Sequence, residues 1–314
     1  SRRREWPRVD VTDGSEHGDV PVRLPPAVFK AIRQAMGPVL IQVPRRGYRS
    51  ALSCNDCREP ATCKDCAGPL VQLRADAPPV CRWCAKPESP WRCANCHGAD
   101  LRAPVIGQLR TAEEFAAAFG DRQIVTSGGD QVLSEVEPAE NLLILATPGA
   151  EPTVTHGYAL VVLLDTWLML GRDDIRVVEE SYRRWFNALA LSSFGGAAVA
   201  VGEPANLQGL VRADPVGVAI RELAERAQTH LPPVGRVAAI DGPPAVIEQL
   251  ASRDWPSFVD VLGPVPADQG RERLILRVPR REGMALAKVL KELAAERSAA
   301  KETGVRIQID PAAF

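Results

Sequence analysis

The sequence predicts an α/β protein in which a cysteine-rich metal module is inserted into a parallel sheet, followed by a smaller α+β domain. Three observations predict this fold class. Short strands that are apolar on both faces alternate with helical segments, which is typical of a parallel sheet covered by helices. All eight cysteines of the 314-residue chain lie between residues 54 and 96. Beyond residue 230 the pattern follows the order βαββαβ.

The first domain is expected to begin after a polar lead-in over residues 1–21 that contributes nothing to the core. From Pro25, Val28, Ile32 and Met36 recur at helical spacing, and a Gly-Pro break precedes an apolar strand. The expected elements are a helix from residue 25, a strand over 39–43, a helix over 112–119, strands over 123–126, 142–147 and 159–165, a helix over 172–191, a strand over 197–202 and a helix over 217–228. One strand precedes the cysteines and several follow them, so the cysteine module is an insertion.

The second domain is expected after the break Leu231-Pro232-Pro233. The expected elements are strands over 236–240, 258–262, 273–278 and 305–309, and helices over 244–252 and 283–299, with both helices on one face of the sheet. The predicted domains are therefore a lead-in over 1–21, an α/β domain over 22–50 and 101–229, a two-zinc insertion over 51–100 and a C-terminal α+β domain over 230–314.

The cysteines form four C-x2-C pairs. Each pair can present two thiolates to one tetrahedral Zn²⁺, and eight sulfurs satisfy two closed sites with none left over. Four thiolates leave no open coordination position, so we expect two structural zinc ions that provide most of the folding free energy of the module. Spacing alone does not decide which pairs share a metal. The pairs are Cys54/Cys57, Cys63/Cys66, Cys81/Cys84 and Cys93/Cys96.

Other uses of the cysteines fit less well. A disulfide framework would require poor bridging geometry four times over, and no secretory signal precedes it. The segment from Cys93 to His97 spells a c-type haem attachment site, but haem would leave zinc ligands without partners. A redox pair would need a single C-x2-C beside a βαβ unit, and an iron–sulfur cluster would favour a tighter run of cysteines.

Composition argues against a membrane protein and against a strongly basic surface. The formal net charge is −1, and 46% of the residues are hydrophobic. The longest apolar runs, such as residues 159–164, are far shorter than the roughly twenty residues of a membrane span. We expect a soluble cytoplasmic protein with reduced thiols. Because the chain begins at Ser1 without a methionine, we expect a segment of a longer protein.

Three groups of residues are candidates for contact with DNA. In the cysteine module, cations alternate with aromatic rings that can stack on unpaired bases, although the tryptophans would equally serve as a small core over the zinc knuckles. Two arginines follow the first strand at its carboxyl end, where open α/β sheets place ligands, and an arginine stripe follows one C-terminal strand. The arginines after the first strand would equally fit a solvated loop that hydrogen-bonds the zinc insertion, and the stripe would equally fit a solvated sheet face. The candidates are Arg82, Trp83, Trp91 and Arg92; Arg45 and Arg46; and Arg271, Arg273 and Arg277.

The cysteine spacing, preceded by Arg45-Arg46-Gly47-Tyr48 and followed by Leu231-Pro232-Pro233, Gly263-Pro264-Val265-Pro266-Ala267 and Ile309-Asp310-Pro311, resembles the C-terminal half of the PriA family. Members of this family, also called primosomal protein N′, are bacterial replication-restart DNA helicases. The resemblance covers residues 22–314. It implies that the α/β domain is a RecA-like second helicase lobe and that the last domain contacts DNA. It also implies a nested pairing, with Cys54, Cys57, Cys93 and Cys96 on one zinc and Cys63, Cys66, Cys81 and Cys84 on the other.

The chain departs from the family at the motifs for ATP. No G-x4-G-K-[ST] segment occurs in the sequence, and such a loop is needed to cradle phosphates. Where active members carry G-T-Q-M-x-x-K-G, this chain has Ala146-Thr147-Pro148-Gly149-Ala150-Glu151-Pro152. Where they carry Q-V-x-G-R-A-G-R, residues 187–196 contain no arginine. An arginine finger contributes about 10³ to 10⁵ in rate, so ATP hydrolysis is expected to be negligible and no catalytic or ATP-binding residue is assigned.

The sequence therefore favours a replication-restart primosome protein that recognises stalled or branched forks and helps reload the replicative helicase without helicase activity of its own. The resemblance implies as partners branched or single-stranded DNA, other primosome proteins, single-stranded DNA-binding protein and the helicase-loading machinery, at a nucleoid-associated location. The alternative is an active 3′–5′ helicase whose first lobe lies outside this chain. A third hypothesis, a zinc-ribbon protein of transcription or redox sensing, predicts knuckles without a surrounding α/β lobe.

Overall fold

The structure, a computed structural model, describes residues 6–13, 24–44, 52–57, 59–65, 70–71, 78–81, 86–102, 108–171, 174–267 and 270–311. The chain divides into two compact units, and the second consists mainly of Ala219–Phe314. The division falls within the helix α6 (Pro215–Gln228). Of the helices in these ranges, none is long and apolar enough to cross a lipid bilayer.

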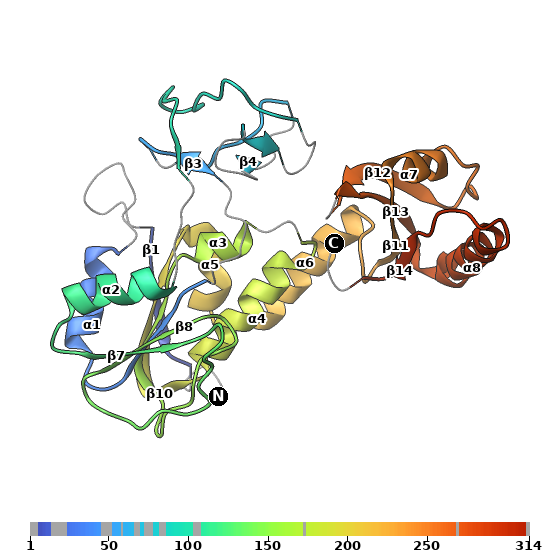
Figure 1. The fold of residues 1–314 in the computed structure, drawn as a ribbon. Helices are drawn as coiled ribbons and strands as arrows, with labels where there is room; N and C mark the ends of the chain where they lie inside the picture. The colour runs from blue at the N-terminus through green and yellow to red at the C-terminus, as the bar shows by residue number, and fades with distance from the viewer. Residues whose placement is uncertain are drawn as a thin grey trace. The chain divides into compact units, whose positions relative to one another are not determined.

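A six-stranded parallel sheet forms the centre of the first unit (Figure 1). The strands lie in the order β1–β10–β9–β2–β8–β7, and every neighbouring pair is parallel. These pairings confirm the expected parallel sheet. Its strands are buried on both faces, and parallel strands need helical crossovers rather than hairpins to connect them. The strands are β1 (Arg8–Thr12), β2 (Val39–Gln42), β7 (Gln123–Ser127), β8 (Leu142–Ala146), β9 (Tyr158–Leu163) and β10 (Ser192–Val201).

Helices cover both faces of this sheet. The helices α1 (Pro26–Gln34) and α2 (Gln108–Ala118) pack on one face. The helices α3 (Thr166–Leu170), α4 (Val177–Leu189) and α5 (Pro204–Val211) pack on the other. The helix after β2 and the helices after β9 thus lie on opposite faces, although β2 and β9 are neighbours. Open parallel sheets bind ligands at the carboxyl ends of strands at such a change of side.

Two predictions for the N-terminal part of the chain are wrong. Residues 8–12 are not an exposed lead-in, because they form β1 and pair with β10, and Val9 is buried. As an edge strand with alternating apolar residues, β1 gives a weak signal in the sequence. Met36 does not extend the apolar face of the first helix: α1 ends at Gln34, and Met36 is 91% exposed.

The cysteine-rich module is built on two short antiparallel ladders. The strands β3 (Ser53–Cys54) and β6 (Leu101–Arg102) pair near the two ends of the module. The strands β4 (Leu70–Val71) and β5 (Val80–Cys81) form the second ladder. Between them lies a small core of Leu52, Cys54, Ala61, Cys63, Leu70, Cys81, Trp91 and Cys93.

The second unit contains a four-stranded antiparallel sheet in the order β12–β13–β11–β14. Its elements follow the predicted βαββαβ order, and both long helices pack on the face that carries Leu274 and Leu276. The opposite face carries Arg273, Ile275 and Arg277, since side chains alternate along a strand. The elements are β11 (Gly235–Gly242), α7 (Pro244–Ala251), β12 (Asp260–Pro266), β13 (Glu272–Pro279), the 3₁₀ helix η3 (Arg280–Glu282), α8 (Gly283–Ala299) and β14 (Arg306–Ile309).

Candidate metal centre and nucleic-acid surface

Four cysteines from the two ends of the inserted module meet at one point. The Sγ atoms of Cys54, Cys57, Cys93 and Cys96 all lie within 4.8 Å of one another. Sγ of Cys54 lies 3.5 Å from Sγ of Cys96, and Sγ of Cys57 lies 3.5 Å from Sγ of Cys93. Thiolates bound tetrahedrally to zinc at about 2.3 Å would be about 3.8 Å apart. The arrangement can therefore hold a metal ion of this size and ligand preference.

The backbone around this cluster is fixed by local hydrogen bonds. Cys54 N–H donates to the carbonyl of Glu59 at 2.8 Å, and Cys93 N–H donates to the carbonyl of Gly98 at 3.0 Å. The β3–β6 ladder sets Cys54 opposite Leu101. Both C-x2-C turns are thereby held by the same ladder, which explains why pairs 36 residues or more apart in the sequence converge.

The local hydrogen bonds of Cys93 lower the pKa of its thiol. The N–H of Cys96 donates to the Cys93 sulfur, and this bond is the main reason why the pKa of the Cys93 thiol is lowered from 9.0 to about 7. Metals bind the thiolate form. His97 is exposed and does not belong to the four-sulfur cluster.

The second set of cysteines is only half described. Cys63 and Cys81 are buried in the small core of the module, while Cys66 and Cys84 lie outside the described residues. A buried carboxylate supports the Cys63 turn: Lys64 N–H donates to Glu88 Oε1 at 2.9 Å, and Glu88 is 7% exposed. The turn that carries Cys63 is thus held in place from a distant part of the module.

The predicted DNA contacts of the module and of the end of the first strand divide into three groups. Trp91 is buried in the small core of the module, so its ring is unavailable for stacking on bases and packs against the cysteines instead. Arg92 is exposed. The remaining candidates, Arg45, Arg46, Arg82 and Trp83, lie outside the described residues.

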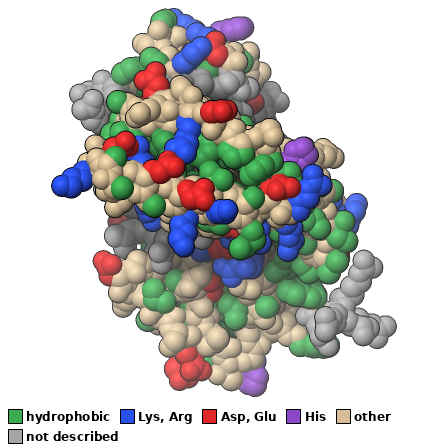
Figure 2. Space-filling view, turned by 90° about the vertical axis from the view of Figure 1, so that its right-hand side faces the viewer, with side chains coloured by type: hydrophobic (Ala, Val, Ile, Leu, Met, Phe, Trp, Pro, Cys, Tyr) green, Lys and Arg blue, Asp and Glu red, His purple; other side chains and the backbone are tan. Residues whose placement is uncertain are grey.

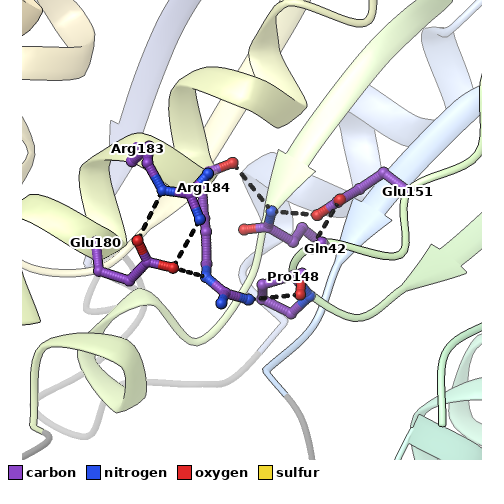
Figure 3. A network of polar contacts seen from close by, with 7 residues as sticks. Gln42, Pro148, Glu151, Glu180, Arg183 and Arg184 are labelled. Atoms are coloured by element: carbon purple, nitrogen blue, oxygen red, sulfur yellow. Dashed lines mark hydrogen bonds and ion pairs between the residues drawn. The ribbon is translucent and has the colours of Figure 1, made fainter. Parts of the chain in front are cut away.

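At the carboxyl edge of the parallel sheet, polar groups bind one another (Figure 3). Gln42 ends β2 and is 2% exposed. Its Nε2 donates to Glu151 Oε1 at 2.6 Å and to the carbonyl of Arg184 at 3.4 Å. Gly149 N–H donates to Glu151 Oε2 at 2.9 Å. The loop after β8 is therefore tied to the end of β2, next to the change of side between β2 and β9.

The same network fixes the arginines of α4. Arg184 Nη1 donates to the carbonyl of Pro148 at 2.7 Å, and Arg184 Nε donates to Glu180 Oε1 at 2.6 Å. Arg183 donates to both oxygens of Glu180 at 2.7 Å. The hydrogen bond from Arg183, together with Arg184, lowers the pKa of Glu180 from 4.5 to about 2. Sequence reasoning missed this network, although Gln42 is a polar residue at the end of an apolar strand.

The arginine stripe of the C-terminal domain is largely neutralised. Arg273 donates through Nε and Nη2 to the two oxygens of Asp241, at 2.6 and 2.8 Å. Arg277 donates through Nη2 to Asp260 at 3.0 Å. Arg271 Nη2 donates to the backbone carbonyl of Asp241 at 2.8 Å. Arg273 and Arg277 are therefore bound to carboxylates, and Arg271 uses one donor on a neutral group.

The chain has no net excess of cations that would offset this pairing. Figure 2 shows Lys and Arg side chains interspersed with Asp and Glu side chains over the face that it presents. The formal net charge of the whole chain is −1. Any attraction of nucleic acid must come from local clusters.

These features define a class of protein: an α/β protein that carries a cysteine cluster able to hold a metal and a separate antiparallel C-terminal unit. Residues 227–312 match the family described as the primosomal protein N C-terminal domain. The probable replication restart protein PriA of Mycobacterium tuberculosis is 39% identical over 98% of this chain and 52% of its own length. That of Mycobacterium leprae is 41% identical over the same shares.

Over 98% of its length the chain is therefore similar to replication restart proteins of the PriA family, and its C-terminal residues match that family's model. The resemblance predicted from the cysteine spacing is thereby confirmed. The chain spans about half the length of the curated relatives that it matches.

Proposed function

We propose that this protein recognises stalled or branched replication forks and helps reload the replicative helicase, without helicase activity of its own. The names of the relatives support a role in replication restart. The observation that carries the non-catalytic part of the proposal is the closed network at the carboxyl edge of the parallel sheet.

That edge is where a RecA-like lobe would contact its ligands, and we propose that the first unit is such a lobe in degenerate form. The polar atoms there are engaged with one another: the Gln42 amide binds Glu151, and Glu151 accepts from the loop at Gly149. A nucleotide or strand entering here would have to break these hydrogen bonds, and leaving the buried Gln42 amide unsatisfied would cost about 1 to 3 kcal/mol.

The segment over residues 187–196, where active family members carry the arginine finger, has no arginine that could act on a transferred phosphate. The arginines just upstream, Arg183 and Arg184, are both bound to Glu180, and Arg184 also donates to Pro148. Without a finger, phosphoryl transfer loses about 10³ to 10⁵ in rate.

For the cysteines, we propose two structural zinc ions. Cys54, Cys57, Cys93 and Cys96 would hold the first, and their sulfur separations fit it. Cys63, Cys66, Cys81 and Cys84 would hold the second. Four-thiolate sites supply folding free energy rather than chemistry.

The DNA-contacting parts are proposed to be the exposed residues of the zinc module, with Arg92 and the candidates Arg45, Arg46, Arg82 and Trp83, together with the C-terminal unit. We retain the domain boundaries predicted above, except that the first domain begins with β1. Primosome proteins, single-stranded DNA-binding protein and the helicase-loading machinery remain the proposed partners, at the nucleoid.

The test is ATP turnover by the natural protein in its full length with forked DNA. We expect salt-dependent fork binding but no DNA-stimulated ATP hydrolysis and no strand separation, while a relative that retains G-x4-G-K-[ST] serves as positive control. ATP-dependent unwinding by the natural protein would establish the alternative, an active 3′–5′ helicase with its first lobe outside this chain.

A further inference from the structure

The two faces of the sheet in the second unit differ. Among the described residues, α7 and α8 cover one face, and the segment that follows α6 reaches the other, where the Thr229 carbonyl accepts from Arg277 Nη1 at 2.6 Å. Both long helices pack on the face of Leu274 and Leu276. On the other face, strand pairing sets Asp241 of β11 opposite Arg273 of β13 and opposite Arg306 of β14. Since directly paired residues of antiparallel strands share a face, these three side chains form one row across the sheet.

Three guanidinium groups surround the single carboxylate of this row. Arg273 is bound to Asp241 through two hydrogen bonds, and Arg271 donates to the carbonyl of the same residue. Arg306 contributes to the electrostatic stabilisation of the Asp241 anion. The pKa of Asp241 is lowered, first by the hydrogen bond from Arg273 and then by the charges of Arg273, Arg271 and Arg306. The carboxylate therefore stays ionised, and the cluster has an excess of two positive charges.

Two of the three cations keep donors for a ligand. A guanidinium has five N–H donors. The Arg271 side chain donates to the Asp241 carbonyl. Within the described residues, the Arg306 side chain forms no hydrogen bond or ion pair, and Arg306 is exposed. Arg273 has fewer donors left for a ligand, because its guanidinium is bound to the Asp241 carboxylate and its side chain is only 18% exposed.

The next row carries no such excess. Arg277 is paired with Asp260, and the residue between the rows on β13 is Ile275. Among the described residues of this face, the paired positions of β11, β12, β13 and β14 include no aromatic side chain. The face thus offers charge without a ring on which a base could stack.

We infer that Arg271 and Arg306 bind phosphate groups of a single DNA strand at the face of the sheet opposite α7 and α8, while Asp241 and Arg273 hold the cluster together. The inference rests on the proposed DNA-binding function and replaces the stripe predicted from the sequence, Arg271, Arg273 and Arg277, by a pair from two strands. Charge complementarity selects a polyanion. The lack of rings predicts contact with the backbone and no preference for base sequence.

The experiment measures the binding of fluorescent single-stranded oligonucleotides, one of dT only and one of mixed sequence, between 50 and about 300 mM KCl. The variant is Arg271→Gln with Arg306→Gln. The matched control is Lys288→Gln with Lys291→Gln, which removes the same charge from α8 on the helical side of the unit. Thermal unfolding of each variant establishes that the fold is retained.

We expect the salt slope of the Arg271/Arg306 variant to be shallower by about 1.4, at about 0.7 for each lost contact on a single strand. The slope of the control should be unchanged, and both oligonucleotides should respond equally. If both double variants weaken binding alike, or if neither changes the slope, the inference is overturned and the proposed function stands. If the unmodified protein binds no DNA, both fail.

Discussion

Gln42 is a polar residue in an otherwise apolar strand, and its burial depends on finding partners. It has them in Glu151 and the carbonyl of Arg184. The sequence indicates the strand, but not the partners, because Glu151 and Arg184 lie 109 and 142 residues away. The periodicity of neighbouring residues carries no information about contacts between residues so far apart in the sequence. The same limit hid the Asp241–Arg306 pair, which joins β11 and β14 across 65 residues.

Glu180 allows a test of the network by pH. A pKa lowered from 4.5 to about 2 means that the carboxylate stabilises the folded state fully above its ordinary pKa. That stability is lost as the pH falls through the range between these two values. We expect Glu180→Gln to cost about 1 kcal/mol at pH 7, and the difference from the unmodified protein to close as the pH falls from about 4.5 towards 2.

Urea unfolding at several pH values measures this difference. Glu179→Gln is the matched control, because it removes the same charge from the neighbouring, exposed position of α4. A gap that stays constant down to pH 2, or one equal to that of the control, would contradict the interpretation that Glu180 is held by Arg183 and Arg184.

At the scale of elements, the strands of the parallel sheet and the βαββαβ unit could be predicted because their apolar runs are long enough to be distinctive. The exceptions have physical reasons. The edge strand β1 has two buried residues, Val9 and the polar Thr12. The helix α3 has five residues and begins after Asp165 in the left-handed region. The helix α5 begins at Pro204, and its Pro and Gly residues resemble a loop.

The turn into β9 offers a second prediction, at the scale of an element. Gly157 has a φ of +79°, and a Cβ there would lie 2.7 Å from the carbonyl oxygen of Leu191. Gly129 has a φ of +62°, with no atom within 4 Å of such a Cβ. We expect Gly129→Ala to cost about 1 to 2 kcal/mol for the left-handed backbone alone.

Gly157→Ala should cost about 1 to 3 kcal/mol more, because the backbone of the start of β10 must also move. Equilibrium unfolding of the two variants gives the comparison directly. Equal losses would show that the Leu191–Ser193 segment yields without cost and that the close approach is not required for the β9–β10 pairing.

At the scale of the whole molecule, the cysteine module and the sheet that carries it have separate cores. Eight thiolates in closed tetrahedral sets require two zincs per chain. We expect metal analysis to return two, and Cys63→Ser to release one and unfold the module locally while the unfolding transition of the parallel sheet persists. Asn55→Ser, beside Cys54 but not a ligand, should keep both metals.

One zinc per chain in the unmodified protein, or iron in place of zinc, would disprove the two-site proposal. Loss of the whole cooperative transition in Cys63→Ser would show instead that the module and the sheet fold as one body. Calorimetry with and without a chelator distinguishes these outcomes, since the sheet itself offers no described cysteine.

The β3–β6 ladder has a consequence for protein engineering. Because Ser53 pairs with Arg102, the chain enters and leaves the module at adjacent points, about 5 Å apart. A short graft could therefore replace the module, or the module could be transplanted onto another scaffold at a hairpin position, with little change to the host backbone. A cassette with this layout is exchangeable between proteins as a single piece.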